Sequence, residues 1–311
     1  MAIELPTEYR TVAEGLRFPE GPTALDDGSV LVVEIERRTL SRVGPDGRVD
    51  VVAECGGGPN GSAIGPDGKV WITNNGGCFE WIDLGTVLVP GPVPDDWTGG
   101  SIQRVDLDTG AVETVYTHCD GRPLRAPNDL VFDAHGGFWF TDHGVRLERS
   151  SDLTGVFYAA ADGGSIREVL HPLEAPNGIG LSPAGDRLYV AETHTGRVYA
   201  WDVPEPGTAT GSGLMAPHGE LLAGLPGMQL LDSLAVDGAG NVCVGTLSNG
   251  GVTVISPDGA SVQHLAIDDL LVTNIAFGGA DLRTAYVTAS GTGRLLAFDW
   301  PVDGLALAHR R

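Results

Sequence analysis

The chain has 311 residues, and its 41 acidic against 19 basic side chains give a formal net charge of −22, which repels nucleic acid and anionic membrane surfaces. A hydrophobic fraction of 42% is ample for a buried core, but no stretch reaches the roughly 18 apolar residues of a membrane helix, and we expect no signal peptide. The four cysteines form no CxxC pair, which argues against a thiolate zinc site and favours a cytoplasmic protein with reduced thiols.

A motif typical of two β-strands around a tight turn recurs six times along the chain. Each copy has a polar residue, usually after a proline, then a short apolar run, a turn that contains glycine and a second apolar run. The glycine follows the polar residue by eight positions in the first five copies, whereas Leu282 stands there in the sixth. The polar residues that open the copies are Glu20, Asn60, Asn128, Asn177, Asp232 and Asn274.

The spacing of these copies predicts the fold. Successive copies begin 40, 68, 49, 55 and 42 residues apart, and a period near 40–50 residues fits one four-stranded propeller blade. Third strands such as 40–43 and fourth strands such as 49–52 follow the paired runs. We therefore expect an all-β, six-bladed propeller with four-stranded antiparallel blades, formed by residues 1–311 as a single domain.

The ends of the chain are expected to close the ring. Residues 9–14 resemble the fourth strands of the blades, so we predict that an N-terminal strand at about residues 8–14 completes the last blade. Closure of this kind protects the edges of the sheets. The apolar segment 305–308 competes for the same position.

The six polar residues are expected to form one ring at the axis, because the innermost strand of each blade lines the central channel. All six offer side-chain oxygens, two are carboxylates, and none is basic. Such a donor set suits a hard divalent cation, and two buried carboxylates would be costly without one. The structural alternative is that the amides cap strand ends and bind water.

A second set of polar residues ends the second strands, at Glu34, Asn74, Asp142, Glu192 and Thr246. Strand tilt can bring some of them to the same mouth of the channel. Asp142 with His143, and Glu192 with the following Thr193 and His194, are candidates for supporting the ring or for acid and base groups. The alternative is that they are solvated loop residues.

At these residues the chain resembles the senescence-marker-protein/gluconolactonase/luciferin-regenerating-enzyme family, also called SMP-30-like. The marks are 18–22 (FPEGP), 126–130 (APNDL), 175–179 (APNGI), 232–237 (DSLAVD) and 273–279 (TNIAFGG), in order and at blade spacing. The resemblance implies a six-bladed propeller and a divalent ion held by Glu20, Asn177 and Asp232, with Asn128 on the metal or the substrate. It also implies hydrolysis of sugar lactones or other lactones, and related propellers hydrolyse phosphofluoridates.

Two features depart from the family pattern or add to it. Members that act on sugar lactones often carry arginine two residues before the third-blade asparagine, whereas this chain has Ala126 there and Arg125 one residue earlier. An insertion of roughly residues 78–100 in the second blade holds Phe79, Trp81 and Trp97. A loop of this length is often a lid, and an aromatic lid favours a ligand less polar than a simple sugar lactone.

The resulting hypothesis is a metal-dependent lactonase acting on a small-molecule substrate. The cation polarises the carbonyl, Asn128 orients the substrate, and Asp232 is the first choice of base, with Glu192, Asp142 or His143 as alternatives. Calcium is the expected ion, and zinc, manganese or magnesium are alternatives. Asn60, Asn274, Trp97 and Arg125 are further candidates for contacts with substrate or ligands.

Other functions on the same scaffold stay open. They are a metal-dependent enzyme of another type, such as a cyclase, isomerase or phosphoester-type hydrolase, a non-catalytic propeller stabilised by calcium, and a protein-interaction propeller. The exact substrate, the oligomeric state and the pathway are not predicted.

Overall fold

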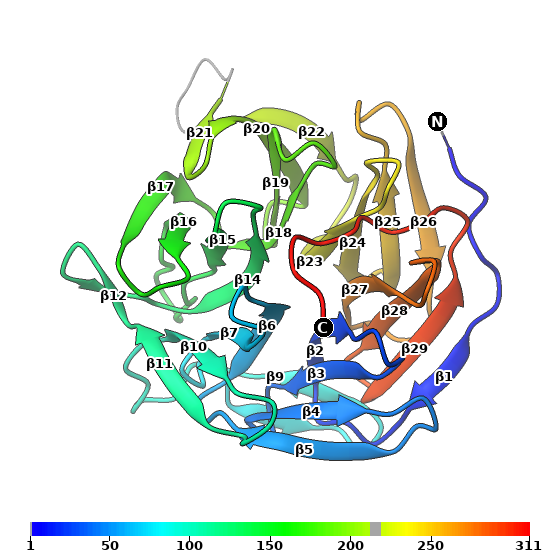
Figure 1. The fold of residues 1–311 in the computed structure, drawn as a ribbon, viewed down its shortest axis with the longest axis horizontal. Coiled ribbons are helices and arrows are strands. Elements are labelled where there is room, and N and C mark those ends of the chain that lie inside the picture. Colours follow the sequence, from blue (N-terminus) through cyan, green and yellow to red (C-terminus); the bar gives the residue numbers. More distant parts are fainter. Residues whose placement is uncertain (1, 212–218) are drawn as a thin grey trace.

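The computed structural model describes residues 2–211 and 219–311, and within them six antiparallel sheets surround a central axis like the blades of a propeller (Figure 1). This confirms the predicted fold. Five of the sheets have four strands, and the fourth blade has five because β21 and β22 both pair with β20. The described residues contain no helix long and apolar enough to cross a membrane.

Each blade runs from an inner strand at the axis to an outer strand at the surface. In this order the strands are β2 (Pro19–Ala24), β3 (Val30–Glu34), β4 (Thr39–Val43) and β5 (Val49–Glu54); β6 (Pro59–Ile64), β7 (Val70–Asn74), β10 (Ser101–Val105) and β11 (Val112–Tyr116); β14 (Pro127–Phe132), β15 (Gly137–Asp142), β16 (Thr154–Ala160) and β17 (Ile166–Leu173); β18 (Pro176–Leu181), β19 (Arg187–Glu192), β20 (Arg197–Glu205), β21 (Thr208–Thr210) and β22 (Glu220–Gly224); β23 (Leu230–Val236), β24 (Val242–Leu247), β25 (Gly251–Ile255) and β26 (Val262–Ala266); β27 (Val272–Gly278), β28 (Thr284–Ala289), β29 (Arg294–Asp299) and β1 (Arg10–Ala13).

The two chain ends take different places. β1 pairs antiparallel with β29 and is the outer strand of the sixth blade. The C-terminal segment, residues 304–311, forms no blade strand and crosses the axis instead, where it ends near the centre in Figure 1. At its start, the backbone amide of Leu305 donates a hydrogen bond to the carbonyl of Val236. At its end, the carbonyl of Arg311 accepts one from the backbone amide of Asp26.

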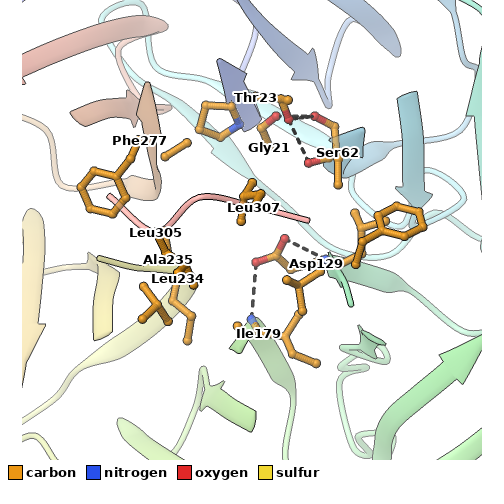
Figure 2. Close-up of a pocket in the computed structure, with 18 of the residues that line it drawn as sticks. Gly21, Thr23, Ser62, Asp129, Ile179, Leu234, Ala235, Phe277, Leu305 and Leu307 are labelled. Carbon is orange, nitrogen blue, oxygen red and sulfur yellow. Dashed lines mark hydrogen bonds between the residues drawn. The ribbon is translucent and has the colours of Figure 1, made fainter. Parts of the chain in front are cut away.

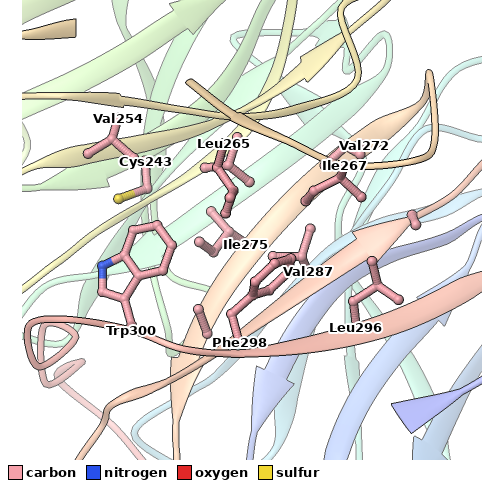
Figure 3. Packing of buried hydrophobic residues seen from close by; sticks show 13 residues of the cluster. Cys243, Val254, Leu265, Ile267, Val272, Ile275, Val287, Leu296, Phe298 and Trp300 are labelled. Atoms are coloured by element: carbon pink, nitrogen blue, oxygen red, sulfur yellow. The ribbon is translucent and has the colours of Figure 1, made fainter. Parts of the chain in front are cut away.

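The apolar core lies between neighbouring blades. Between the fifth and sixth blades, for example, Trp300 and Phe298 pack with Cys243, Ile275 and Val287, all of them buried (Figure 3). Because residues alternate between the two faces of a strand, each sheet can contribute side chains to the layers on both of its sides. This packing holds the inner strands at fixed distances around the channel.

The sixth turn explains why its copy of the motif departs from the other five. Leu282 adopts a φ of 59°, the left-handed region that glycine supplies in the corresponding turns, as at Gly28 and Gly68. Such a φ is unfavourable for a branched side chain. The turn therefore keeps its geometry although its glycine is missing.

Two short hairpins lie outside the blades. β8 (Trp81–Asp83) pairs with β9 (Leu88–Pro90) inside the second-blade insertion, and β12 (His118–Cys119) pairs with β13 (Arg122–Pro123). The amide of Leu88 bonds to the carbonyl of Gly291, at 2.8 Å, in the sixth blade. The insertion thus leaves the second blade and reaches the sixth.

Candidate functional site

Every inner strand is irregular at the position of its ring residue. The pairing with the second strand shifts register between Glu20 and Thr23, Pro59 and Ser62, Pro127 and Leu130, Pro176 and Ile179, Leu231 and Leu234, and Val272 and Asn274. A bulge of this kind bends a strand and redirects its side chains. The recurring polar residue of the motif therefore stands at or beside a bulge in all six blades.

Glu20 is the buried carboxylate of the first blade, with 2% of its surface exposed. Its Oε2 accepts hydrogen bonds from the side-chain amide of Asn274, at 2.7 Å, and from the backbone of Gly21. Its Oε1 is buried without a hydrogen-bond partner in the protein. Burial raises the pKa of Glu20 to about 7.

Asn128 also has an unused hydrogen-bond acceptor, because its side-chain Oδ1 is buried without a protein partner. Its backbone is held by the neighbouring blade, since the hydroxyl of Thr73 donates to the carbonyl of Asn128. The hydroxyl of Thr141 donates in the same way to the carbonyl of Asn177, at 2.6 Å. These threonines, which the motif did not single out, tie the second strand of one blade to the ring residue of the next.

Asn177 and Asp232 occupy the fourth and fifth blades of the ring. The amide of Asn177 donates to Thr193 Oγ1 at 3.1 Å, and its Oδ1 accepts a longer bond from Ser233 at 3.4 Å. Asp232 is half-buried, and its pKa is raised well above the usual value by desolvation and by the charge of Glu20. Asn60 completes the ring as a buried amide.

Asp129 is a buried acid next to ring residue Asn128, which the sequence motif did not single out. Its Oδ1 accepts from the amide of Leu130 at 2.9 Å, and its Oδ2 from that of Ile179 at 3.5 Å (Figure 2). Desolvation and the charge of Glu20 raise its pKa to about 8. The sequence does hold a signal for it, because the position directly after the ring residue is glycine in three other copies of the motif and aspartate in this one.

The polar residues that end the second strands are neither solvated nor free. Asp142 accepts bonds from the backbone amides of Arg125 and Ala126, both at 2.7 Å, and from Gly144 at 3.0 Å. Burial raises the pKa of Asp142, but these bonds favour its charged form. Its carboxylate therefore anchors the loop that leads into Asn128.

Three other second-strand residues act on their own loops in the same way. Glu34 accepts from the amide of Arg17, Asn74 from that of Gly58, and Glu192 from that of Glu174, at 2.7 to 3.0 Å. Thr246 differs, because its hydroxyl pairs with Thr253 inside the fifth blade. Each of the three side chains Glu34, Asn74 and Glu192 thus binds the backbone two or three residues before a ring residue.

His143 and His194 form a pair beside the ring, with ring centroids 5.7 Å apart. Burial lowers the pKa of both, that of His143 to about 4, so both are neutral near pH 7. Because Nδ1 of His143 lies 3.1 Å from the carbonyl oxygen of Gly144, it must donate there, which leaves Nε2 as a hydrogen-bond acceptor. His194 directly follows Thr193, which contacts Asn177.

The second-blade insertion, roughly residues 78–100, lies beside the mouth of the channel where the inner strands begin, because its Trp97 contacts the loops next to β7 and β14. Trp97 donates its Nε1–H to the carbonyl of Asn75 at 2.8 Å, and the guanidinium of Arg125 lies 4.5 Å from the Trp97 ring centroid. Arg125 also pairs with Asp152 at 2.8 Å. Arg125 is thus engaged by two side chains of the mouth.

The C-terminal segment covers the opposite mouth, where the inner strands end. A cavity of about 100 Å³ lies between it and the ring. Asp129 faces this cavity, and Leu305 and Leu307 lie on its C-terminal side (Figure 2). The end of the channel where the inner strands begin is therefore the better entrance for a ligand.

The donor atoms of the ring fit a hard cation. Two buried oxygens, Oε1 of Glu20 and Oδ1 of Asn128, have no protein partner, and carboxylate and amide oxygens are calcium ligands. The described residues hold no group of three or more His, Cys, Asp or Glu side chains suited to a metal. The candidate site combines two acids with amides instead.

Comparisons with known proteins place this geometry in context. Residues 18–291 match the family model described as SMP-30/Gluconolactonase/LRE-like region. A gluconolactonase of Zymomonas mobilis is 25% identical over 93% of this chain and 80% of its own length, and the lactonase drp35 of Staphylococcus saprophyticus is 33% identical over 81% and 68%. The crystal structure of regucalcin, a calcium-binding protein from Agrobacterium tumefaciens, has a TM-score of 0.77 at 19% identity, with 100% of both chains covered.

Proposed function

Because the chain belongs to the SMP-30/gluconolactonase/LRE-like family, we propose that it is a hydrolase that opens a lactone at a divalent cation on the propeller axis. The observation that carries the proposal is the pair of buried, unpartnered oxygens on Glu20 and Asn128. Relatives named gluconolactonase, lactonase and pentonolactonase, the last from Haloferax volcanii, support the reaction class.

Glu20, Asn128, Asn177 and Asp232 would hold the ion, and calcium suits this set of oxygen donors best. When bound, the cation would polarise the lactone carbonyl and stabilise the negative charge that develops on its oxygen. The cation would also offset the cost of placing the carboxylates of the buried Glu20 and the half-buried Asp232 in one ring. The regucalcin structure, described as a calcium-binding protein, is consistent with this choice.

The residues of the chain supply the proton transfers. A water oxygen attacks the carbonyl carbon, and a carboxylate oxygen of Asp232 takes the proton that this water loses. The bond from the carbonyl carbon to the ring oxygen then breaks, and the proton passes to that oxygen, which becomes the hydroxyl of the product. Asn128 orients the substrate through its side-chain amide.

The other acids that the sequence offered as candidate bases have different roles. Asp142 and Glu192 are occupied by backbone amides, so we assign them to positioning Asn128 and Asn177. His143 keeps an acceptor at Nε2 and binds a substrate hydroxyl or water at the mouth.

The test is hydrolysis of a panel of sugar and non-sugar lactones by chelator-treated protein, followed with a pH indicator. Ca²⁺, Zn²⁺, Mn²⁺ or Mg²⁺ is added back, and Asp232→Asn is compared with Asp258→Asn, an exposed aspartate on a turn of the same blade. Activity restored by a cation and lost only in Asp232→Asn supports the proposal. Tight cation binding without turnover of any lactone contradicts it.

A further inference from the structure

The insertion packs directly beside two ring residues. Phe18, two residues before Glu20, contacts Trp81 at 4.9 Å between ring centroids and shares a buried cluster with Ile35 and Leu88. At its two ends the insertion packs against Ala126, two residues before Asn128, in a second cluster with Cys78, Val145 and the partly buried Phe79 and Trp97. Both contacts bring apolar surface next to the ring.

Phe18 is held there at a conformational cost. Its φ is 56°, in the left-handed region that a bulky residue rarely adopts. The conformation is retained by the hydrogen bond from the amide of Ile35 to the carbonyl of Phe18, at 3.1 Å, and by the packing against Trp81. Ala175, two residues before Asn177, has a φ of 48° and accepts the same kind of bond from the amide of Thr193, at 3.1 Å, so this conformation belongs to the blade motif and fixes where Phe18 points.

The aromatic side chains of the insertion are not fully covered by this packing. Phe79, Trp81 and Trp97 keep part of their surface exposed. The cations beside these rings are committed to ion pairs. Arg125 is paired with Asp152 and lies over Trp97, and Arg17, next to Phe18, is paired with Glu36 and Asp83.

His143 and His194 follow β15 and β19, the second strands of the third and fourth blades, whereas Phe18 leads into the first blade. Both histidines are neutral and able to bond hydroxyl groups. The mouth is therefore apolar on one side and polar on the other.

From this arrangement we infer that the substrate is a lactone with an alkyl or aryl substituent on its ring. The substituent lies against the exposed part of Trp81, which the buried Phe18 supports, and the polar atoms of the ring face His143 and His194. This inference rests on the proposed function and names the substrate class of the same site. It predicts that simple polyhydroxylated lactones leave the apolar side of the mouth unused.

The experiment compares two lactones that differ only in a side chain, δ-valerolactone and δ-decanolactone, with D-glucono-δ-lactone as the polar reference. The wild-type kcat/KM should be at least about tenfold higher for the decanolactone, the gain expected from burying roughly two methylene groups. In Trp81→Ala the ratio of the two kcat/KM values should fall toward one.

Ile82→Ala is the matched control, because Ile82 is the next residue of β8, is exposed and points to the opposite face of the strand. It should keep the wild-type ratio. Trp81→Phe retains an apolar ring and should keep most of the preference for δ-decanolactone. This variant therefore distinguishes loss of the apolar contact from loss of folding. Melting temperatures of all variants are measured in parallel.

The possible outcomes are distinguishable. A preference for the decanolactone that is lost in Trp81→Ala and kept in Ile82→Ala supports the inference. Equal rates for the two lactones, faster hydrolysis of the gluconolactone, or a preference that survives Trp81→Ala overturns it and leaves the proposed function intact. If no lactone is hydrolysed although the cation binds, the proposed function fails and the inference fails with it.

Discussion

The side-chain amide of Asn274 donates a 2.7 Å hydrogen bond to Oε2 of Glu20, which joins the sixth blade to the first across the closure of the ring. The bond orients the carboxylate, and Oε1 is left buried without a protein partner. A buried oxygen of this kind costs free energy unless a ligand satisfies it. Asn274 is therefore a positioning residue for the candidate cation site.

Replacing Glu20 by glutamine should weaken cation binding. The variant keeps the size of the side chain but removes one of the two charges of the ring, so calcium affinity should fall at least about tenfold. Isothermal titration of chelator-treated protein with Ca²⁺ measures this. Glu113→Gln, on the exposed part of β11, should bind calcium like the wild type. Equal affinity in Glu20→Gln would remove Glu20 from the cation site.

The stability of the metal-free protein should decrease as the pH rises from about 5 to about 8. The pKa values of Glu20 and Asp129 are raised to about 7 and about 8, chiefly by burial, and that of Asp232 is raised as well. The folded state therefore binds these protons more tightly than the unfolded state, and their stabilising contribution is lost as the pH rises through the folded pKa values.

Melting curves between about pH 5 and pH 9 check this prediction. The melting temperature of chelator-treated protein should fall up to about pH 8 and then level off, and saturating Ca²⁺ should reduce the fall because the cation compensates the carboxylates. Asp129→Asn should flatten the dependence, whereas Asp258→Asn should not change it. A melting temperature that is constant in the absence of metal would contradict the assignment of raised pKa values.

The comparison of sequence and structure shows which features a repeat can reveal. The eight-residue spacing from Glu20 to Gly28 identifies the inner strand and its turn, and six copies define six blades. The spacing does not show which way a side chain at a bulge points, so it does not reveal Asp129 beside Asn128. It also does not show hydrogen-bond partners, so Asp142 is a candidate base in the sequence although backbone amides occupy its carboxylate.

Replacing Asp142 by alanine should lower the stability of the protein, because this carboxylate holds the loop that leads into Asn128. Asp142→Ala leaves the amides of Arg125, Ala126 and Gly144 without their acceptor, and we expect a loss of about 2–4 kcal/mol in the free energy of unfolding. Urea denaturation measures the loss. Asp142→Asn keeps one acceptor oxygen and should lie between the alanine variant and the wild type. A loss below about 0.5 kcal/mol in Asp142→Ala would show that the loop does not depend on this carboxylate.

Removal of residues 305–311 should expose the cation site from the side opposite the entrance. These residues cover the cavity that Asp129 faces, so water gains access to the ring, and the bound cation should dissociate faster. Stopped-flow mixing of the calcium-loaded protein with a chelating dye measures the dissociation rate. The double variant Arg310→Ala and Arg311→Ala cuts exposed ion pairs to Asp26 and Asp108 and one exposed hydrogen bond from Arg311 to the carbonyl of Gly68. Such exposed contacts contribute little, so this variant should keep the wild-type rate. An unchanged rate in the truncated protein would show that the segment does not seal the channel, and a higher kcat/KM would make this mouth an entrance for substrate.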